Sequence, residues 1–489
     1  MDFLFILLTF IAFLFLFLFL AFSFFLLSCF IGNSIMDPKY PPAEGTVFGQ
    51  ILYFNRLYDY QTEQAKTHKT FRLLAPGRSE FYTTDPRNIE HILKTQFEKY
   101  TKGKYHEDIL IREFLQSMGK SGGSRGSLQA MSFPQVLRDF SCSVFRKSGA
   151  KLVGVISEFS DAGVVFDMQD ILMRCTLDSI FKVEFGLKRF LNIGSEAKLK
   201  KNVKIIDGFV HGLIKTKREK VTLQQDSNDK EDILSGFLVG SKKDPQKMND
   251  QYLRDIILNF LIAGKDTSAN TLSWFFYMLC RNPLVQEKVA QEVKDVTGSQ
   301  EIEANIDEFV AKITEAALEK MHYLHAALTE TLRLYPAVPR DGRVAETDDI
   351  LPDGYRVKNG DAVCYMSYSM GRMTYIWGDD AEEFRPERWL DNGIFQPESP
   401  FKFIAFHVCN LFHPAELLAS YEQLLILPDI LNYGTGGSSD LLREGLCLQA
   451  MALLRFFRFK LADETRNITY KTMLTLHING DLPLFAVSR

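Results

Sequence analysis

The stretch LIAGKDTSAN, residues 261–270, lies in the middle of a long apolar segment, 251–281. The spacing of the apolar residues in this segment predicts one long helix. Inside a helix, Gly264 costs about 1 kcal/mol relative to alanine, and an acid beside a hydroxyl is costly to bury without partners. Two interpretations follow. The stretch is either a local bend with solvent-facing polar residues, or a helix opened against a cofactor in which Asp266 and Thr267 relay protons.

Two further motifs follow it along the chain, ETLRLYP at 330–336 and FRPERW at 384–389. Glu330 and Arg333 are three residues apart and therefore share one helix face. Taken alone, they are an ordinary surface ion pair of little energetic value. Arg388 offers a third member, which would turn the pair into a buried Glu–Arg–Arg network. The three motifs in this order and at these separations indicate a protein family far more specifically than any one of them does alone.

Together the three motifs resemble those of the cytochrome P450 family. The resemblance covers nearly the whole chain after the N-terminal apolar run, and it implies a predominantly α fold with a small β-rich lobe (α+β). Several blocks are similar to the plant ω-hydroxylase branch, whose members oxidise long-chain fatty acids at the endoplasmic reticulum. These blocks include PPAEGTVFGQ (41–50), LPDGYRV (351–357), GRMTYIWGDDAEEFRPERWLD (371–391) and RFKLADE (458–464).

The resemblance also implies a cofactor, partners and roles for single residues. The cofactor is haem iron with a cysteine thiolate as axial ligand, and the electrons come from NADPH through NADPH–cytochrome P450 reductase. The implied substrate is a long-chain fatty acid or a related aliphatic lipid. The implied site residues are Ala263, Gly264 and Arg343 at the haem, Asp266 and Thr267 for proton delivery, and Glu330, Arg333 and Arg388 as a structural network.

The haem loop of the family, roughly FxxGxRxCxG, is disrupted in FHVCNLFH at 406–413. With Phe406 as the first residue, the glycine falls on Cys409 and the ligand on His413. Cys409 is four positions early and lacks the glycine turn, and Cys447 has no phenylalanine at the right distance before it. Imidazole from His413 would not give thiolate chemistry. The sequence therefore assigns no metal ligand.

The genetic code offers an explanation for this departure. GSSDLLREGLCLQ (437–449) can be encoded by codons that, when the reading frame is shifted by one base, read GPRICLGKDFAY, which fits the haem loop of the family. VCNLF (408–412) can be encoded by codons that begin like a splice donor. EFLQSMGKSGGSRGSLQAMSFP (113–134) gives IFAVDGEKWR when its codons are shifted. We therefore treat 113–134 and 407–450 as anomalous and hypothesise a mis-spliced or mis-predicted gene, with genuine divergence in two loops as the alternative. Genomic DNA that cannot encode the shifted readings would refute this hypothesis.

The N-terminus is the clearest physical signal for localisation. After Asp2 no charge appears before Asp37, a run longer than the roughly 20 apolar residues that span a bilayer. A cleaved signal peptide would carry a basic start and a shorter apolar core. We predict a membrane anchor at 1–36, a stiff proline-rich hinge at 37–45 and a P450-like domain at 46–489. With the resemblance, this implies the endoplasmic reticulum membrane, with the catalytic domain on the cytoplasmic side.

Composition excludes some classes of protein. The chain has 489 residues, of which 46% are hydrophobic, enough for a large core. The net charge of −4 gives no electrostatic case for nucleic-acid binding. Seven cysteines without metal spacing indicate thiols in a reducing compartment. Three hypotheses remain: a fatty-acid monooxygenase, a catalytically inactive and haem-deficient P450-like chain, and a lipid-binding protein without catalysis.

Overall fold

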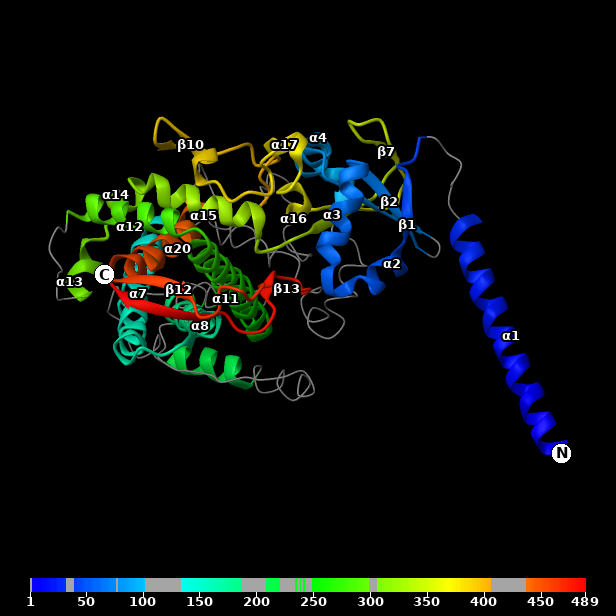
Figure 1. The fold of residues 1–489 in the computed structure, drawn as a ribbon, viewed down its shortest axis with the longest axis horizontal. Coiled ribbons are helices and arrows are strands. Elements are labelled where there is room, and N and C mark those ends of the chain that lie inside the picture. The colour runs from blue at the N-terminus through cyan, green and yellow to red at the C-terminus, as the bar shows by residue number, and fades with distance from the viewer. Residues whose placement is uncertain are drawn as a thin grey trace. The chain divides into compact units, whose positions relative to one another are not determined.

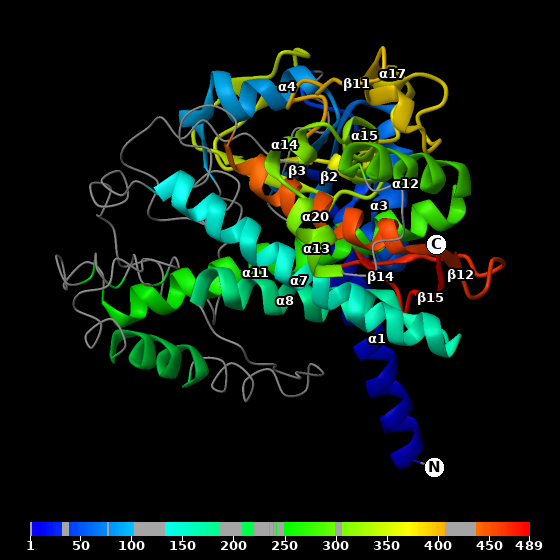
Figure 2. The same cartoon turned by 90° about the vertical axis from the view of Figure 1, so that its left-hand side faces the viewer.

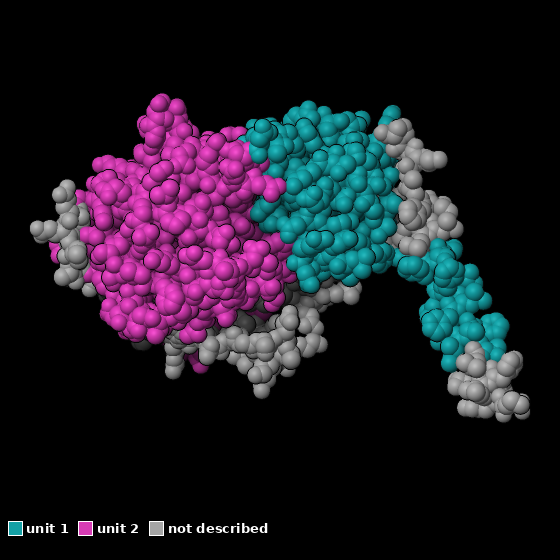
Figure 3. All heavy atoms as spheres, in the orientation of Figure 1, with its two compact units in different colours: residues 1–103, 340–379 teal, residues 104–339, 380–489 magenta. Residues whose placement is uncertain are grey.

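The computed structural model describes residues 2–31, 39–75, 78–101, 133–185, 208–219, 249–298, 306–405 and 437–489, together with Leu234, Leu238 and Ser241. The chain forms two compact units (Figure 3). Unit 1 holds residues 1–103 and 340–379, and unit 2 holds residues 104–339 and 380–489. The start of the predicted hinge, Cys409, His413 and residues 113–132 and 407–436 of the predicted anomalous segments lie outside the described residues.

Unit 1 is built on a six-stranded mixed sheet with the strand order β1-β2-β3-β9-β6-β4. The central strands β2 and β3 pair antiparallel, β3 and β9 pair parallel, and β9 and β6 pair antiparallel. All six residues of β2 are buried, so both faces of this strand are covered. The strands are β1 (Ala43–Thr46), β2 (Thr70–Ala75), β3 (Arg78–Thr83), β4 (Tyr100–Thr101), β6 (Asp341–Ala345) and β9 (Ala362–Tyr365).

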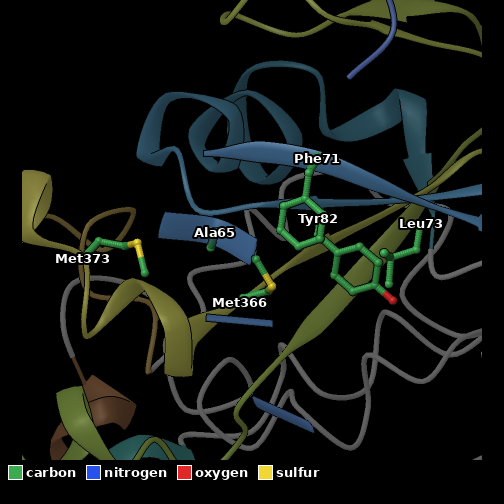
Figure 4. Close-up of a cluster of buried hydrophobic side chains, with 6 residues drawn as sticks. All are labelled: Ala65, Phe71, Leu73, Tyr82, Met366 and Met373. Atoms are coloured by element: carbon green, nitrogen blue, oxygen red, sulfur yellow. The ribbon is translucent and has the colours of Figure 1, made fainter. Parts of the chain in front are cut away.

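The core of unit 1 lies against this sheet. Phe71 on β2 stacks on Tyr82 of β3 with ring centroids 5.3 Å apart, and Ala65 of α3 (Leu57–Thr67) packs in the same cluster with two methionines (Figure 4). The alternating segment around PDG forms a hairpin of β7 (Asp349–Ile350) and β8 (Arg356–Val357). The next strand, β9, joins the six-stranded sheet instead of extending that hairpin.

Short helices complete unit 1. Asp85 caps α4 (Pro86–Glu90) because its side chain accepts a hydrogen bond from the Arg87 backbone N–H. The N-terminal helix α1 runs over Asp2–Ile31 and is followed by α2 (Val47–Leu52). Among the residues that the structure describes, no helix has the length and apolar character that a membrane crossing requires. The span predicted at 1–36 is therefore not found there.

Unit 2 is mostly helical (Figures 1 and 2). The long helix α11 follows the Asn249 cap, and Trp274 near its C-terminal end stacks on Tyr335 with centroids 4.1 Å apart. The indole N–H of Trp274 donates to the Leu476 carbonyl at 2.7 Å, which ties α11 to the C-terminal chain. The longer helices are α7 (Phe133–Ala162), α8 (Met168–Phe185), α11 (Asp250–Arg281), α12 (Pro283–Thr297), α15 (His322–Leu334) and α20 (Gly437–Phe456).

Smaller elements surround these helices. A three-stranded sheet has the order β12-β15-β5, and two hairpins pair β10 with β11 and β13 with β14. Their bounds, with the short helices, are β5 (Phe166–Asp167), β10 (Leu390–Asp391), β11 (Ile394–Phe395), β12 (Phe457–Leu461), β13 (Tyr470–Lys471), β14 (His477–Ile478), β15 (Pro483–Ser488), α13 (Ile306–Lys312), α14 (Glu315–Glu319) and the 3₁₀ turn η6 (Pro386–Trp389).

Helix α20 packs closely on α7 although it begins in a segment that the sequence marks as anomalous. A Cβ added to Gly445 would lie 3.1 Å from the Phe145 ring, so the close approach of the two helices depends on glycine at this position. The side chains that follow, Leu446, Cys447 and Leu448, are all buried. This part of the anomalous segment therefore belongs to the core of unit 2.

Candidate active site

Helix α11 carries the acid and hydroxyl that the sequence singles out. The helix is continuous from Asp250 to Arg281, so the structure shows no opening of its backbone at Gly264. Gly264 is buried, whereas Asp266 and Thr267 are half-buried. Ala263 lies on the same turn of the backbone. The acid and the hydroxyl are therefore partly accessible on a helix that is otherwise largely buried in this region.

Asp266 lies between two groups that can carry positive charge. The Lys265 ammonium contacts Oδ1 of Asp266 at 2.9 Å, and Nε2 of His477 on β14 lies 4.0 Å from Oδ2. Burial lowers the pKa of His477, and the nearby Asp266 carboxylate only partly opposes this effect. His477 is therefore held mainly neutral near pH 7. The sequence analysis did not identify it, because a lone histidine in a C-terminal strand gives no local signal.

A buried ionic network joins α15 to the FRPERW turn. Glu330 Oε2 accepts from Arg333 Nε at 2.7 Å, and Glu330 Oε1 accepts from Arg333 Nη2 at 2.8 Å. Oε1 also accepts from the Arg385 backbone N–H at 2.9 Å and from Arg388 Nε at 3.4 Å. The indole of Trp389 donates to Oε2 at 2.8 Å. One carboxylate therefore organises both arginines.

The donors of the two arginines that face away from Glu330 also have hydrogen-bond partners. Arg333 donates to the carbonyl oxygens of Ala381 and Glu383. Arg388 Nη1 contacts Asp380 Oδ1 at 3.1 Å, and hydrogen bonding from Arg388 lowers the pKa of Asp380. The sequence analysis missed Asp380, although it lies within a block quoted for the family resemblance. Buried charges are tolerated when they are paired and hydrogen-bonded in this way, so the network holds the FRPERW turn against α15.

Arg343 lies elsewhere in the molecule. It sits on β6 in unit 1, is 2% exposed, and its guanidinium carbon lies 4.9 Å from the centroid of the Phe97 ring. The other site residues predicted from the sequence all lie in unit 2. The structure therefore brings together Glu330, Arg333 and Arg388, and separately Asp266 and Thr267. The predicted contact of Arg343 with a haem propionate stays a prediction.

Two of the described cysteines, Cys447 and Cys280, do not fit a thiolate ligand to haem iron. The thiol of Cys447 is buried and lies 3.3 Å from His325 Nδ1. His325 Nε2 faces the Leu318 carbonyl at 3.0 Å, so Nε2 carries the hydrogen and Nδ1 accepts from the thiol. Burial raises the pKa of Cys280 to about 12, which disfavours its thiolate. Within the described part of the chain, no cluster of three or more His, Cys, Asp or Glu side chains could hold a metal ion.

Comparison with known proteins places the chain in a family. The sequence model described as "Cytochrome P450" matches residues 188–408. Cytochrome P450 704C1 of Pinus taeda is 39% identical over 510 aligned positions that cover 93% of each chain. Cytochrome P450 704B1 of Arabidopsis thaliana is 38% identical over 76% of this chain and 83% of its own. Cytochrome P450 94C1 of the same plant is 31% identical over 89% and 90%.

The chain belongs to the cytochrome P450 family, and its relatives named here are plant proteins. Members of the family are monooxygenases that use haem iron, take electrons from NADPH through a reductase and act on lipophilic substrates. The roles that the resemblance assigns to the α11 acid and hydroxyl and to the α15 network stay predictions. Cys280 and Cys447 do not agree with such an enzyme, and the segment around Cys409 and His413 lies outside the described residues.

Proposed function

We propose that this chain descends from, and in its intact form acts as, a haem-thiolate monooxygenase that hydroxylates long-chain fatty acids or related aliphatic lipids. The observation that carries the proposal is the half-buried Asp266–Thr267 pair on α11, flanked by Lys265 and His477, in a chain similar to plant P450s along 93% of its length. The choice of a fatty acid rests on the sequence blocks that resemble the ω-hydroxylase branch.

Within this proposal the residues of the chain have separate roles. A haem with a thiolate ligand would supply the activation of oxygen, and the described cysteines give no basis for deriving a step through it. The Asp266 carboxylate would take a proton from solvent at Oδ2, on the side of His477, and the Thr267 hydroxyl would pass it inward. Lys265 holds Oδ1 and so fixes the orientation of the carboxylate. Glu330, Arg333 and Arg388 hold the backbone and touch no reacting atom.

Membrane attachment also belongs to this proposal. It rests on the uncharged run after Asp2 and on the resemblance to enzymes of the endoplasmic reticulum. The proposed partners are the membrane and NADPH–cytochrome P450 reductase, with the catalytic domain on the cytoplasmic side. Cell fractionation that recovers the chain without membranes would contradict this placement.

The proposed reaction is tested with the full chain, reductase, NADPH and palmitate. Hydroxypalmitate is quantified by mass spectrometry, and haem is quantified per chain. Thr267→Ala should lower product formed per NADPH consumed by about 10²-fold or more if the hydroxyl passes protons. Ser241→Ala, a hydroxyl loss outside α11, is the control and should leave this ratio unchanged. A haem-loaded chain that forms no oxidised lipid would refute the proposed substrate class.

A second candidate is a catalytically inactive, haem-deficient P450-like chain. Two observations favour it: the thiol of Cys447 is buried against His325, and the family match ends at residue 408, one position before Cys409. The carbon monoxide difference spectrum of the reduced protein and the sequence of the transcript across codons 400–455 decide between the two. A thiolate-type Soret band from the chain as written would exclude this candidate. Fatty-acid binding without iron would instead favour a lipid-binding protein.

A further inference from the structure

We propose that Ser399 is a phosphorylation site for a proline-directed protein kinase, the class of kinase that transfers phosphate to a serine or threonine followed by proline. Ser399 lies in QPESPFK, residues 396–402, directly after the β10–β11 hairpin at the surface of unit 2 (Figure 1). Ser399 and Pro400 form the only such pair in the 489 residues of the sequence. A kinase of this class would therefore meet a single acceptor hydroxyl in the whole chain.

The backbone around Ser399 forms a turn that its residue types favour. The Lys402 and Phe403 backbone N–H groups both donate to the Ser399 carbonyl at 2.9 Å. Serine at the first position and proline at the second are favoured in the commonest β-turn. Proline also holds the preceding residue in an extended conformation and has no N–H of its own. A cleft that binds the Ser–Pro pair therefore supplies no hydrogen-bond partner for the position after the serine.

The acceptor hydroxyl is accessible on this turn. Ser399 is exposed, and its Oγ accepts a hydrogen bond from the Phe401 N–H at 3.3 Å. This distance is beyond the usual range for N–H···O hydrogen bonds, so the contact holds the hydroxyl weakly. The apolar residues of the turn are anchored instead: Phe401 is 9% exposed, and the Phe403 ring packs edge-on against Trp389 with centroids 5.0 Å apart. The hydroxyl can therefore enter a kinase cleft while the turn stays packed.

Lys402 places a basic group three residues after the acceptor. Its ammonium pairs with Glu398 Oε1 at 2.5 Å, and the two side chains are 29% and 38% exposed. Ion pairs with this exposure contribute little free energy, so Lys402 can exchange Glu398 for an acidic group of a bound protein. The lysine complements a kinase cleft that is acidic where it meets the third residue after the serine. The partner is therefore a proline-directed kinase that selects a basic residue at this position.

The proposed step uses ATP as co-reactant. A bond forms between Ser399 Oγ and the γ-phosphorus while the bond from that phosphorus to the oxygen shared with the β-phosphate breaks. ADP leaves, and the hydroxyl proton passes to a carboxylate of the kinase. The phosphoserine carries a charge of about −1.5 to −2 at pH 7, so it repels Glu398 and offers Lys402 a stronger partner. We expect Lys402 to move from Glu398 to the phosphate.

The test uses the purified full chain in nanodiscs of a neutral phospholipid, with ATP and a purified cyclin-dependent kinase, which selects Ser–Pro with a basic residue at the third position. Phosphate is located by mass spectrometry of peptides, and we expect it at Ser399. A synthetic peptide of residues 394–405 serves as the unfolded reference. A chain that takes up no phosphate while the peptide does would overturn the proposal, because the fold would then hide the hydroxyl. Phosphate found only at other residues, or on neither the chain nor the peptide, would overturn it as well.

Matched variants test how the kinase recognises the turn. Pro400→Ala keeps the acceptor hydroxyl and should slow phosphorylation by about tenfold or more, whereas Pro397→Ala removes a proline outside the Ser–Pro pair and should leave the rate unchanged. Lys402→Met should also slow phosphorylation by about tenfold. Its control is Lys460→Met, which removes an exposed lysine on β12. Equal rates for a variant and its control would refute the role given to that residue.

The proposal relies on the cytoplasmic placement proposed above only for access to ATP and kinases in the cell. The assay with purified kinase requires neither haem nor lipid oxidation. Phosphorylation of a chain that oxidises no lipid would therefore support the site while the proposed reaction fails. Cell fractionation tests the placement separately.

Discussion

The Glu330 network gives the sharpest prediction for stability. Glu330→Gln replaces one carboxylate oxygen by an amide nitrogen of almost the same size. The Glu330 and Arg333 side chains are both 0% exposed, and Arg388 is 8% exposed. The variant therefore leaves two buried guanidinium groups facing a group that is neutral and partly a donor. Breaking a buried pair by removing one partner costs about 3–5 kcal/mol, and we expect a loss of this size in the free energy of unfolding.

The measurement is urea unfolding of the full chain, followed by tryptophan fluorescence. Trp389 reports directly, because its indole donates to Glu330. Glu398→Gln is the matched control: the same chemical change breaks the Glu398–Lys402 ion pair, which is partly exposed, and should cost less than about 1 kcal/mol. Equal losses in the two variants would show that the buried network contributes no more than a surface pair, and would refute the reasoning.

Three further predictions follow from the same structure. The folded-state pKa of His477 is lowered, so its contribution to stability is fully present above the ordinary value of 6.5 and is lost as pH falls below that value. His477→Asn should therefore reduce the pH dependence of the free energy of unfolding, measured between pH 7 and pH 5, and an unchanged slope would contradict this. Gly445→Ala should destabilise unit 2 by about 1–3 kcal/mol by overpacking against Phe145, and an unchanged melting temperature would contradict the close contact. Cys447→Ala should lower the free energy of unfolding by about 1–3 kcal/mol, because it leaves His325 Nδ1 without a hydrogen-bond partner. Haem bound per chain, measured by absorbance, should stay the same, and a loss of haem would identify Cys447 as a ligand.

The sequence predicted the buried network well because its members lie on one helix face and on one short turn. Glu330 and Arg333 are neighbours in any helix, and the FRPERW motif adds Arg388 at a recognisable distance. The long helix around Asp266 was predictable for a similar reason, since its apolar pattern is continuous. Local patterns account for the Glu330–Arg333 pair and the long helix, whereas the contact of Arg388 with Glu330, 58 residues apart, followed from the order of the motifs.

Other features depend on pairings between distant segments, which local patterns do not encode. Strand β9 follows the β7–β8 hairpin in the chain, yet it pairs in parallel with β3, about 280 residues earlier. His477 comes near Asp266 only because β14 packs on α11. The sequence analysis treats the segment from 437 as anomalous, but α20 buries Leu446 and Leu448, and Leu448 lies against Gly149 of α7. In each case tertiary packing decided the outcome, and no local pattern indicated it.

The central position of β9 has a consequence for biosynthesis. During translation β3 emerges early, but its neighbour in the sheet, residues 362–365, is made much later. At ordinary rates of synthesis the delay is on the order of tens of seconds. Throughout that interval one edge of β3 offers unpaired backbone groups to other nascent chains. We therefore expect the growing polypeptide to need a chaperone or a membrane-bound ribosome until the strand that closes the sheet has left the exit tunnel.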